Sequence, residues 1–159
     1  MKAIVVYYSF EGNTKLIAEH IAKETGAELL ELKPEKEIPK GGFKKFFWGG
    51  KSVIFKDKPR LINTIPDLAP YDTIFIGTPI WAGSFTPPIN TFLANAAIRS
   101  KKLAFFACHS GGGADKCFDK LKNTLTGNTV IGTAAFTDPA KTEPDPVNEK
   151  VKNWLATIL

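Results

Sequence analysis

The sequence has few residues that bind metals or form disulfides. Cys108 and Cys117 are its two cysteines, they are not in a C-x-x-C pair, and the two histidines are not spaced as ligands. Two cysteines cannot build the disulfide framework of a small secreted protein, and these spacings match no zinc or redox motif. We therefore expect neither a metal site nor a disulfide scaffold.

Long hydrophobic runs are also absent. No run approaches the roughly 18 residues of a membrane-spanning helix, and the apolar start of the chain has no A-x-A cleavage pattern. We expect no membrane association and a cytoplasmic location. A chain of 159 residues with 43% hydrophobic and 23% charged residues is typical of one soluble domain, residues 1–159.

Acidic residues are scarce in one segment. The net charge is +5, but residues 33–60 hold nine basic and three acidic groups, so this segment carries +6 and the remainder −1. A local basic patch suits an acidic protein surface better than nucleic acid, whose binding usually needs a broader positive face. The alternative is a solvated surface with no partner.

The two common phosphate-binding loops, G-x-x-x-x-G-K-[ST] and G-x-G-x-x-G, are missing as well. Instead, an apolar strand at 3–8 runs into small and polar residues, and a helical pattern begins at Lys15. The first N–H groups of such a helix have no partner inside it, and its dipole favours anions there. This turn therefore predicts a phosphate site, the alternative being an ordinary turn in which Ser9 and Asn13 cap the helix.

Strand and helix patterns alternate along the chain. The strands are expected at residues 3–8, 27–32, 73–77, 103–108 and 129–136. The helices are expected from Lys15, from Pro87, after the glycine run with Cys117 on its apolar face, and from Pro146 with Asp145 as cap. Alternation of this kind predicts an α/β fold, a doubly wound parallel sheet with helices on both faces.

Residues 34–66 are the exception to this alternation. Proline and glycine interrupt the segment, yet it holds too many large apolar side chains for a disordered linker. We expect it to fold over the domain, with a short helix at 43–48.

In a doubly wound sheet, ligands bind outside the carboxyl ends of the strands. Three loops rich in small and polar residues follow the first, third and fourth strands, so all three open on the same edge. They are Tyr8-Ser9-Phe10-Glu11-Gly12-Asn13-Thr14, Gly77-Thr78-Pro79-Ile80-Trp81-Ala82-Gly83 and Cys108-His109-Ser110-Gly111-Gly112-Gly113.

In order and position, these loops resemble the phosphate loop and the two ring-binding loops of the flavodoxin family, in a branch with a glycine run in the last loop. The resemblance covers essentially the whole chain. It implies a five-stranded parallel sheet of order 2-1-3-4-5 in a three-layer sandwich, and bound FMN. The cofactor-binding residues that it implies are Ser9, Phe10, Glu11, Gly12, Asn13, Thr14, Thr78, Pro79, Ile80, Trp81, Ala82, Gly83, Cys108, His109, Ser110, Gly111, Gly112 and Gly113.

Several of these residues suit such roles chemically. Trp81 lies in a Gly/Pro/Ser-rich loop at the mouth of the sheet, so stacking on the flavin is favoured over a place in the core. The glycines allow main-chain groups to approach the ring edge. Two features depart from the family pattern: Glu11 stands where Thr or Ser is common, and the last loop lacks the Tyr that often covers the outer face of the ring. That face is open, or covered by His109 or residues 43–48.

Residues 78–90 and 109–114 contain no acid. Negative charges near the ring disfavour an anionic reduced flavin, and a unit charge ~10 Å away contributes roughly 1–2 kcal/mol before screening. We therefore expect the second one-electron reduction to occur at a less negative potential than in acidic flavodoxins.

The resemblance favours a low-potential electron carrier that shuttles one or two electrons between redox partners. Its expected partner is an acidic redox protein, such as a ferredoxin-like donor or acceptor, docked on residues 33–60, and the carrier is expected to be a monomer or weak dimer. The alternative is an NAD(P)H-dependent quinone or flavin reductase on the same fold. A phosphoacceptor domain is disfavoured because this sequence lacks the carboxylate cluster that such a domain needs. A hydrolase built on Cys108 and His109 is disfavoured because adjacent side chains usually point apart.

Overall fold

Five strands alternate with helices in the structure. The computed structural model describes residues 2–37 and 57–159. The strands are β1 (Ala3–Tyr7), β2 (Glu28–Glu31), β3 (Thr73–Pro79), β4 (Lys102–His109) and β5 (Thr129–Thr137). The helices are α1 (Asn13–Thr25), α3 (Pro87–Asn95), α4 (Ala114–Thr124), α5 (Pro144–Ile158) and the 3-10 turn η1 (Pro139–Lys141).

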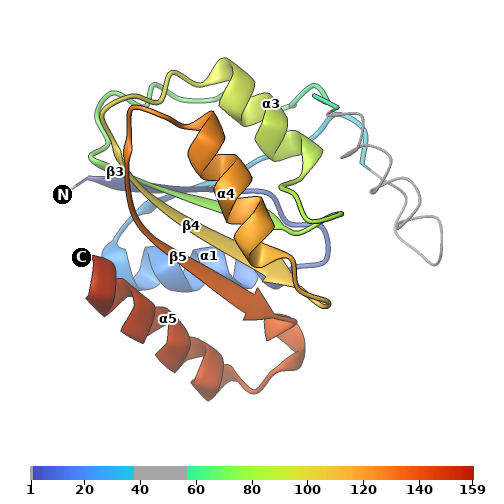
Figure 1. Ribbon diagram of the computed structural model, residues 1–159, viewed down its shortest axis with the longest axis vertical. Coiled ribbons are helices and arrows are strands. Elements are labelled where there is room, and N and C mark those ends of the chain that lie inside the picture. Colours follow the sequence, from blue (N-terminus) through green and yellow to red (C-terminus); the bar gives the residue numbers. More distant parts are fainter. Residues whose placement is uncertain (1, 38–56) are drawn as a thin grey trace.

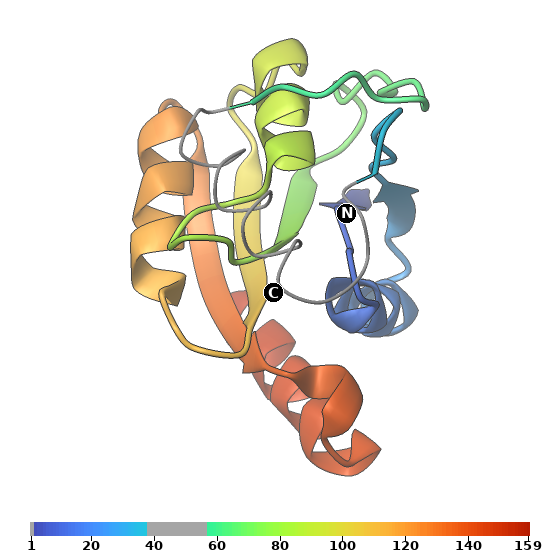
Figure 2. The ribbon, with the colours of Figure 1, turned by 90° about the vertical axis from the view of Figure 1, so that its right-hand side faces the viewer.

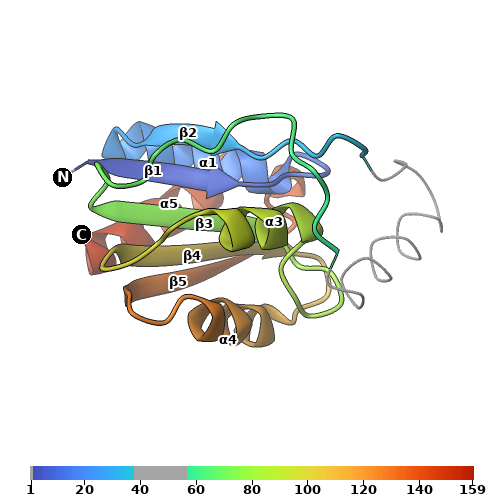
Figure 3. The same cartoon turned by 90° about the horizontal axis from the view of Figure 1, so that it is seen from above.

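The strands form one parallel sheet of order β2-β1-β3-β4-β5, which is the order that the family resemblance implies (Figure 3). Each observed strand ends within one or two residues of the predicted boundary. The largest difference is at β3, which was expected to break after Gly77. Thr78 and Pro79 instead continue the pairing, opposite Ala107 and Cys108 of β4.

Helices cover both faces of the sheet, which gives three layers (Figure 1). Side chains alternate along β1, because successive residues of a strand point to opposite faces. Ile4 and Val6 belong to the core that also contains Phe92 of α3. Val5 belongs to the core that contains Ile17 of α1 and Val151 of α5. The sheet is therefore buried on both sides, which explains its nearly continuous apolar strands.

All five strands point the same way, so the loops that follow them share one edge. Figure 2 views the molecule from this edge, with α1 and α5 on one side of the sheet and α3 and α4 on the other. This placement brings together loops that are far apart in the sequence.

The two described flanks of the irregular segment pack beside β2 and α3. Pro34 and Leu61 form an antiparallel bridge, and the Thr91 hydroxyl donates to the carbonyl of Pro59 at 2.7 Å. Asn63 accepts from the N–H of Lys33 and donates to the carbonyl of Glu31, both at 2.9 Å. The helix predicted at 43–48 lies outside the described residues.

The start of the last helix was predicted wrongly. α5 begins at Pro144 with Glu143 as N-cap, rather than at Pro146 with Asp145 as cap. Proline suits the first turn of a helix because its missing N–H would have no partner there. Pro144 is thus as good a start as Pro146, and Asp145 lies in the first turn, where the helix dipole favours an acid.

Within residues 2–37 and 57–159, no helix is both long and apolar enough to span a membrane.

Candidate functional site

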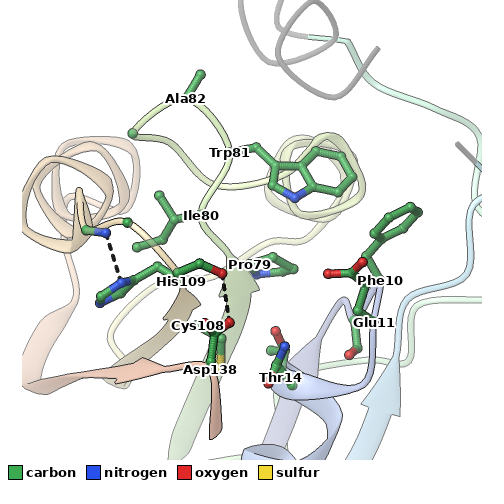
Figure 4. A pocket seen from close by; sticks show the side chains of 16 residues that line it. Phe10, Glu11, Thr14, Pro79, Ile80, Trp81, Ala82, Cys108, His109 and Asp138 are labelled. Atoms are coloured by element: carbon green, nitrogen blue, oxygen red, sulfur yellow. Dashed lines mark hydrogen bonds between the residues drawn. The ribbon is translucent and has the colours of Figure 1, made fainter. Parts of the chain in front are cut away.

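A pocket of about 450 Å³ lies at the carboxyl edge of the sheet (Figure 4). This volume is within the usual range for small-molecule sites. All three predicted loops line it, and it includes every predicted site residue except Gly12, Thr78 and Gly113. Among the described residues that line it, Asp138, which follows β5, is the one that the sequence analysis did not name.

The first loop ends at the N-terminus of α1. Gly12 is the N-cap and adopts a left-handed φ of 92°, which glycine accommodates without strain. The Ser9 hydroxyl accepts a hydrogen bond from the N–H of Lys15 at 3.1 Å, so Ser9 caps the helix as the simpler interpretation proposed. Asn13 has a different role: its side-chain oxygen accepts from the N–H of Ala140 at 2.9 Å and ties this loop to η1.

Capping does not account for Thr14. Its side chain is fully buried and lines the pocket. Its hydroxyl makes no hydrogen bond of standard geometry, although it lies close enough to the Cys108 thiol to lower the pKa of that group. A buried hydroxyl left unpaired costs free energy, so an unpaired one in a pocket is best explained by a ligand that pairs with it. Thr14 lies in the first turn of α1, where the dipole favours an anion.

The second loop is closed at its base by two threonines. The N–H of Thr86 donates to the Thr78 hydroxyl at 3.1 Å, and both side chains are fully buried. Thr78 thus shapes the loop and does not line the pocket. At the tip, Trp81 and Ser84 exchange two backbone hydrogen bonds of 3.0 Å around Ala82 and Gly83, both with left-handed φ. Two such residues define a type I′ turn, in which Gly83 is comfortable and Ala82 is strained.

This turn presents Trp81 to the pocket. The indole is half-buried and makes edge-to-face contacts with Tyr8 and Phe10, at ring-centroid distances of 6.0 and 5.5 Å. Figure 4 shows Trp81 facing Phe10 across the upper part of the pocket. Trp81 therefore both packs on the core and forms a pocket wall, so it can offer an aromatic surface to a ligand.

The third loop is held by its own side chains. His109 Nδ1 accepts from the N–H of Gly112 at 2.9 Å, which leaves any proton of the neutral ring on Nε2. Ser110 donates to the carboxylate of Asp138 at 2.7 Å. Gly113 is the N-cap of α4, with a φ of 89°, and does not line the pocket. In Figure 4, His109 lies on the side of the pocket opposite Phe10 and bonds to the loop.

Cys108 lies in the pocket wall but is not an activated nucleophile. Burial raises the pKa of its thiol to about 12, so the thiol stays protonated near neutral pH. His109 Nδ1 is bonded to Gly112 and does not pair with this thiol. The geometry does not support a cysteine hydrolase.

The pocket does contain carboxylates, Glu11 and Asp138. The two ring-binding loops themselves lack acids, as the sequence shows, but Asp138, which follows β5, adds one from outside them. The argument for a less negative second potential therefore does not extend to the whole pocket. Among the described residues, no group of three or more His, Cys, Asp or Glu could hold a metal ion.

An open parallel sheet whose carboxyl edge has a helix start that favours anions and an aromatic wall is typical of nucleotide- and flavin-binding α/β proteins. The chain belongs to the flavodoxin family, because the family model described as flavodoxin matches residues 2–158.

Solved structures agree with this assignment. A flavoprotein in complex with FMN from Lactobacillus acidophilus is 27% identical, with a TM-score of 0.74, and the match covers 97% of this chain and 98% of that one. A putative flavoprotein from Bacteroides uniformis is 24% identical, with a TM-score of 0.80 and coverage of 95% and 97%, and so supports the fold alone. Oxidised flavodoxin 2 from Bacillus cereus is 18% identical, with a TM-score of 0.64 and coverage of 99% and 97%, and so supports the fold alone.

Proposed function

We propose that this chain binds FMN in the pocket and acts as an electron carrier between redox proteins. The observation that carries the proposal is the buried hydroxyl of Thr14 at the start of α1, which makes no hydrogen bond of standard geometry and lies in a pocket that also has Trp81 as an aromatic wall. A ligand that joins a phosphate to a flat ring matches this pocket, with the phosphate at Thr14 and the ring at Trp81.

The pocket residues fit FMN. Thr14 and the first N–H groups of α1 would hold the phosphate, Trp81 would contact the ring, and the third loop would contact the ring edge with main-chain groups. When bound, FMN supplies one- and two-electron chemistry, which no side chain of the pocket provides. Glu11 opposes a phosphate dianion, so the donors at Thr14 and the helix start must outweigh this repulsion.

A Thr14→Val substitution tests the phosphate end. Valine fills the same volume but has no hydroxyl. Hydrogen bonds to charged groups contribute about 1.5–3 kcal/mol, so FMN affinity should fall by roughly 10- to 100-fold. Riboflavin lacks the phosphate and should bind wild type and variant alike. Titration of the apoprotein by quenching of flavin fluorescence measures both ligands.

The two ligands distinguish a phosphate contact from general damage. An equal loss for FMN and riboflavin would mean that the substitution disturbs the pocket and would remove the support from Thr14. If the wild-type chain binds neither flavin, the proposed function is wrong.

Anaerobic mixing of the flavin-loaded protein with NADPH and with NADH distinguishes an electron carrier from an NAD(P)H-dependent reductase. A carrier should keep its oxidised flavin absorbance over minutes, whereas a reductase should bleach within seconds. Rapid bleaching by either nucleotide would replace the carrier with the quinone or flavin reductase.

We further propose an acidic redox partner, such as a ferredoxin-like protein, and a monomer or weak dimer in solution. Lys33, Lys36, Lys58 and Arg60 are exposed in the described part of the basic segment, together with the acids Glu35, Glu37 and Asp57. The excess of positive charge in the segment therefore comes from its other five basic residues, which lie outside the described residues. Attraction between such a patch and an acidic partner is screened by salt, so the rate of electron exchange should fall as ionic strength rises. A rate that is constant with salt would contradict docking through this segment.

A further inference from the structure

Trp81 lines two cavities. One is the proposed FMN pocket, and the other is a smaller cavity of about 90 Å³ beside the described flanks of the irregular segment. Tyr8 is among the residues that line the smaller cavity, whereas Phe10 is among those that line the FMN pocket. A ligand in the FMN pocket therefore meets one side of the indole, and Tyr8 supports the indole from the side of the smaller cavity.

Tyr8 contacts the second loop through both its main chain and its ring. Its N–H donates to the carbonyl of Gly77, where this loop begins, at 3.2 Å. Its ring is perpendicular to the indole, with an interplanar angle of 88° and centroids 6.0 Å apart. Phe10 makes a similar contact at 5.5 Å and 86°. Because edge-to-face pairs have a preferred geometry, these two contacts together fix the orientation of the indole.

The hydroxyl of Tyr8 is not needed to fill the core. The side chain is 2% exposed and belongs to the core that contains Leu32 and Ile89, where the ring of a phenylalanine would occupy the same space. The hydroxyl instead donates to the carboxylate of Glu37 at 2.9 Å. Burial, together with this carboxylate, raises the pKa of Tyr8, so the phenol keeps its proton and remains a donor near neutral pH.

Glu37 belongs to the basic segment, residues 33–60. The main chain just before it is held in place, because the N–H of Glu35 donates to the carbonyl of Arg60 at 2.8 Å. Hydrogen bonds to an ionised acceptor are about twice as strong as neutral ones. The bond from Tyr8 to Glu37 therefore ties the ring that supports the indole to this segment.

From these contacts, and resting on the proposed FMN site, we infer that Tyr8 is a positioning residue that holds the indole of Trp81 in the orientation that meets the flavin ring. Glu37 fixes the hydroxyl of Tyr8, and the ring of Tyr8 fixes the indole. Phe10 shares the second task but has no polar atom through which it could be anchored. The ring contact in the FMN pocket thus depends on a residue of the basic segment.

The test is Tyr8→Phe, which keeps the ring and removes the hydroxyl. The probe is lumiflavin, which has the flavin ring with a methyl group in place of the ribityl chain and phosphate. Loss of one edge-to-face contact corresponds to roughly a fivefold change in an equilibrium constant, so lumiflavin should bind roughly fivefold more weakly. In a Trp81→Ala background, Tyr8→Phe should change the affinity by less than about twofold, because Tyr8 acts through the indole.

Variants of the acceptor give an independent comparison, and they decide the matter if Tyr8→Phe fails to fold, since Glu37 is exposed. Glu37→Gln keeps an oxygen that accepts from Tyr8, so lumiflavin affinity should stay within about twofold of wild type. Glu37→Leu removes the acceptor and should match Tyr8→Phe. Glu35→Leu is the matched control, because it removes the same charge from an exposed position of the same segment and should leave the affinity unchanged.

Wild-type lumiflavin affinity in either Tyr8→Phe or Glu37→Leu would overturn the inference. A loss from Tyr8→Phe that persists in the Trp81→Ala background would do so too, because a merely structural residue would behave in that way. Equal losses in Glu37→Gln and Glu37→Leu would mean that the charge acts without the hydrogen bond. If wild type binds FMN and these variants match it, the positioning role alone is wrong. If wild type binds no flavin, the proposed function fails first.

Discussion

Gly77→Ala is expected to lower the free energy of unfolding by about 3 kcal/mol or more. Gly77 lies in β3 between Tyr7 of β1 and Phe106 of β4. A methyl group at this position would overlap the ring of Phe106, which is fully buried in the core beneath α1 and α5. The ring cannot move aside without displacing this packed core. Chemical denaturation followed by far-UV circular dichroism measures the loss.

Gly111→Ala is the matched control for this prediction. A Cβ atom at Gly111 would meet no atom within 4 Å, and its φ is not left-handed. The control should stay within about 0.5 kcal/mol of wild type. A Gly77→Ala variant that unfolds at the wild-type denaturant concentration would show that the core beside β3 adjusts easily. It would also mean that contact with Phe106 does not explain why residue 77, at the start of the second loop, is a glycine.

The sheet could be predicted from the sequence because its signals are local and repeated. Apolar segments such as 103–108 are continuous, and Gly26, a residue that commonly ends helices, ends α1 in a left-handed conformation. The start of α5 was placed two residues too late because Pro144 and Pro146 are equivalent local signals. Choosing between them depends on how the helix packs, through Val147 and Val151, which a local pattern does not contain.

The pocket could be predicted because the loops that follow parallel strands lie at one edge of the sheet. Asp138 was missed because this reasoning was not applied to every strand. The loops after the first, third and fourth strands were considered together, yet β5 is parallel to β4 and ends at the same edge. The polar residues after the fifth strand were therefore an available signal. By contrast, the bonds of His109 to Gly112 and of Thr86 to Thr78 depend on how each loop closes, and residue type alone does not specify them.

Trp81→Ala is expected to weaken flavin binding by roughly 10- to 100-fold, since stacking of an aromatic side chain on a base contributes about 1–3 kcal/mol. The loss should be similar for FMN, riboflavin and lumiflavin, because the ring is common to all three. This pattern differs from that of Thr14→Val, which should affect FMN alone. Flavin fluorescence quenching measures all three ligands.

Trp81→Phe is the matched control, because it keeps an aromatic side chain in the same turn. It should lose no more than about fivefold in affinity, since a smaller ring still offers a flat apolar surface. Because Trp81 is half-buried and contacts Tyr8 and Phe10 by its packing, the alanine variant should also unfold somewhat more readily. Wild-type affinity in a folded Trp81→Ala variant would mean that the indole supports the loop without touching the ligand. The aromatic wall of the pocket would then have to come from Phe10.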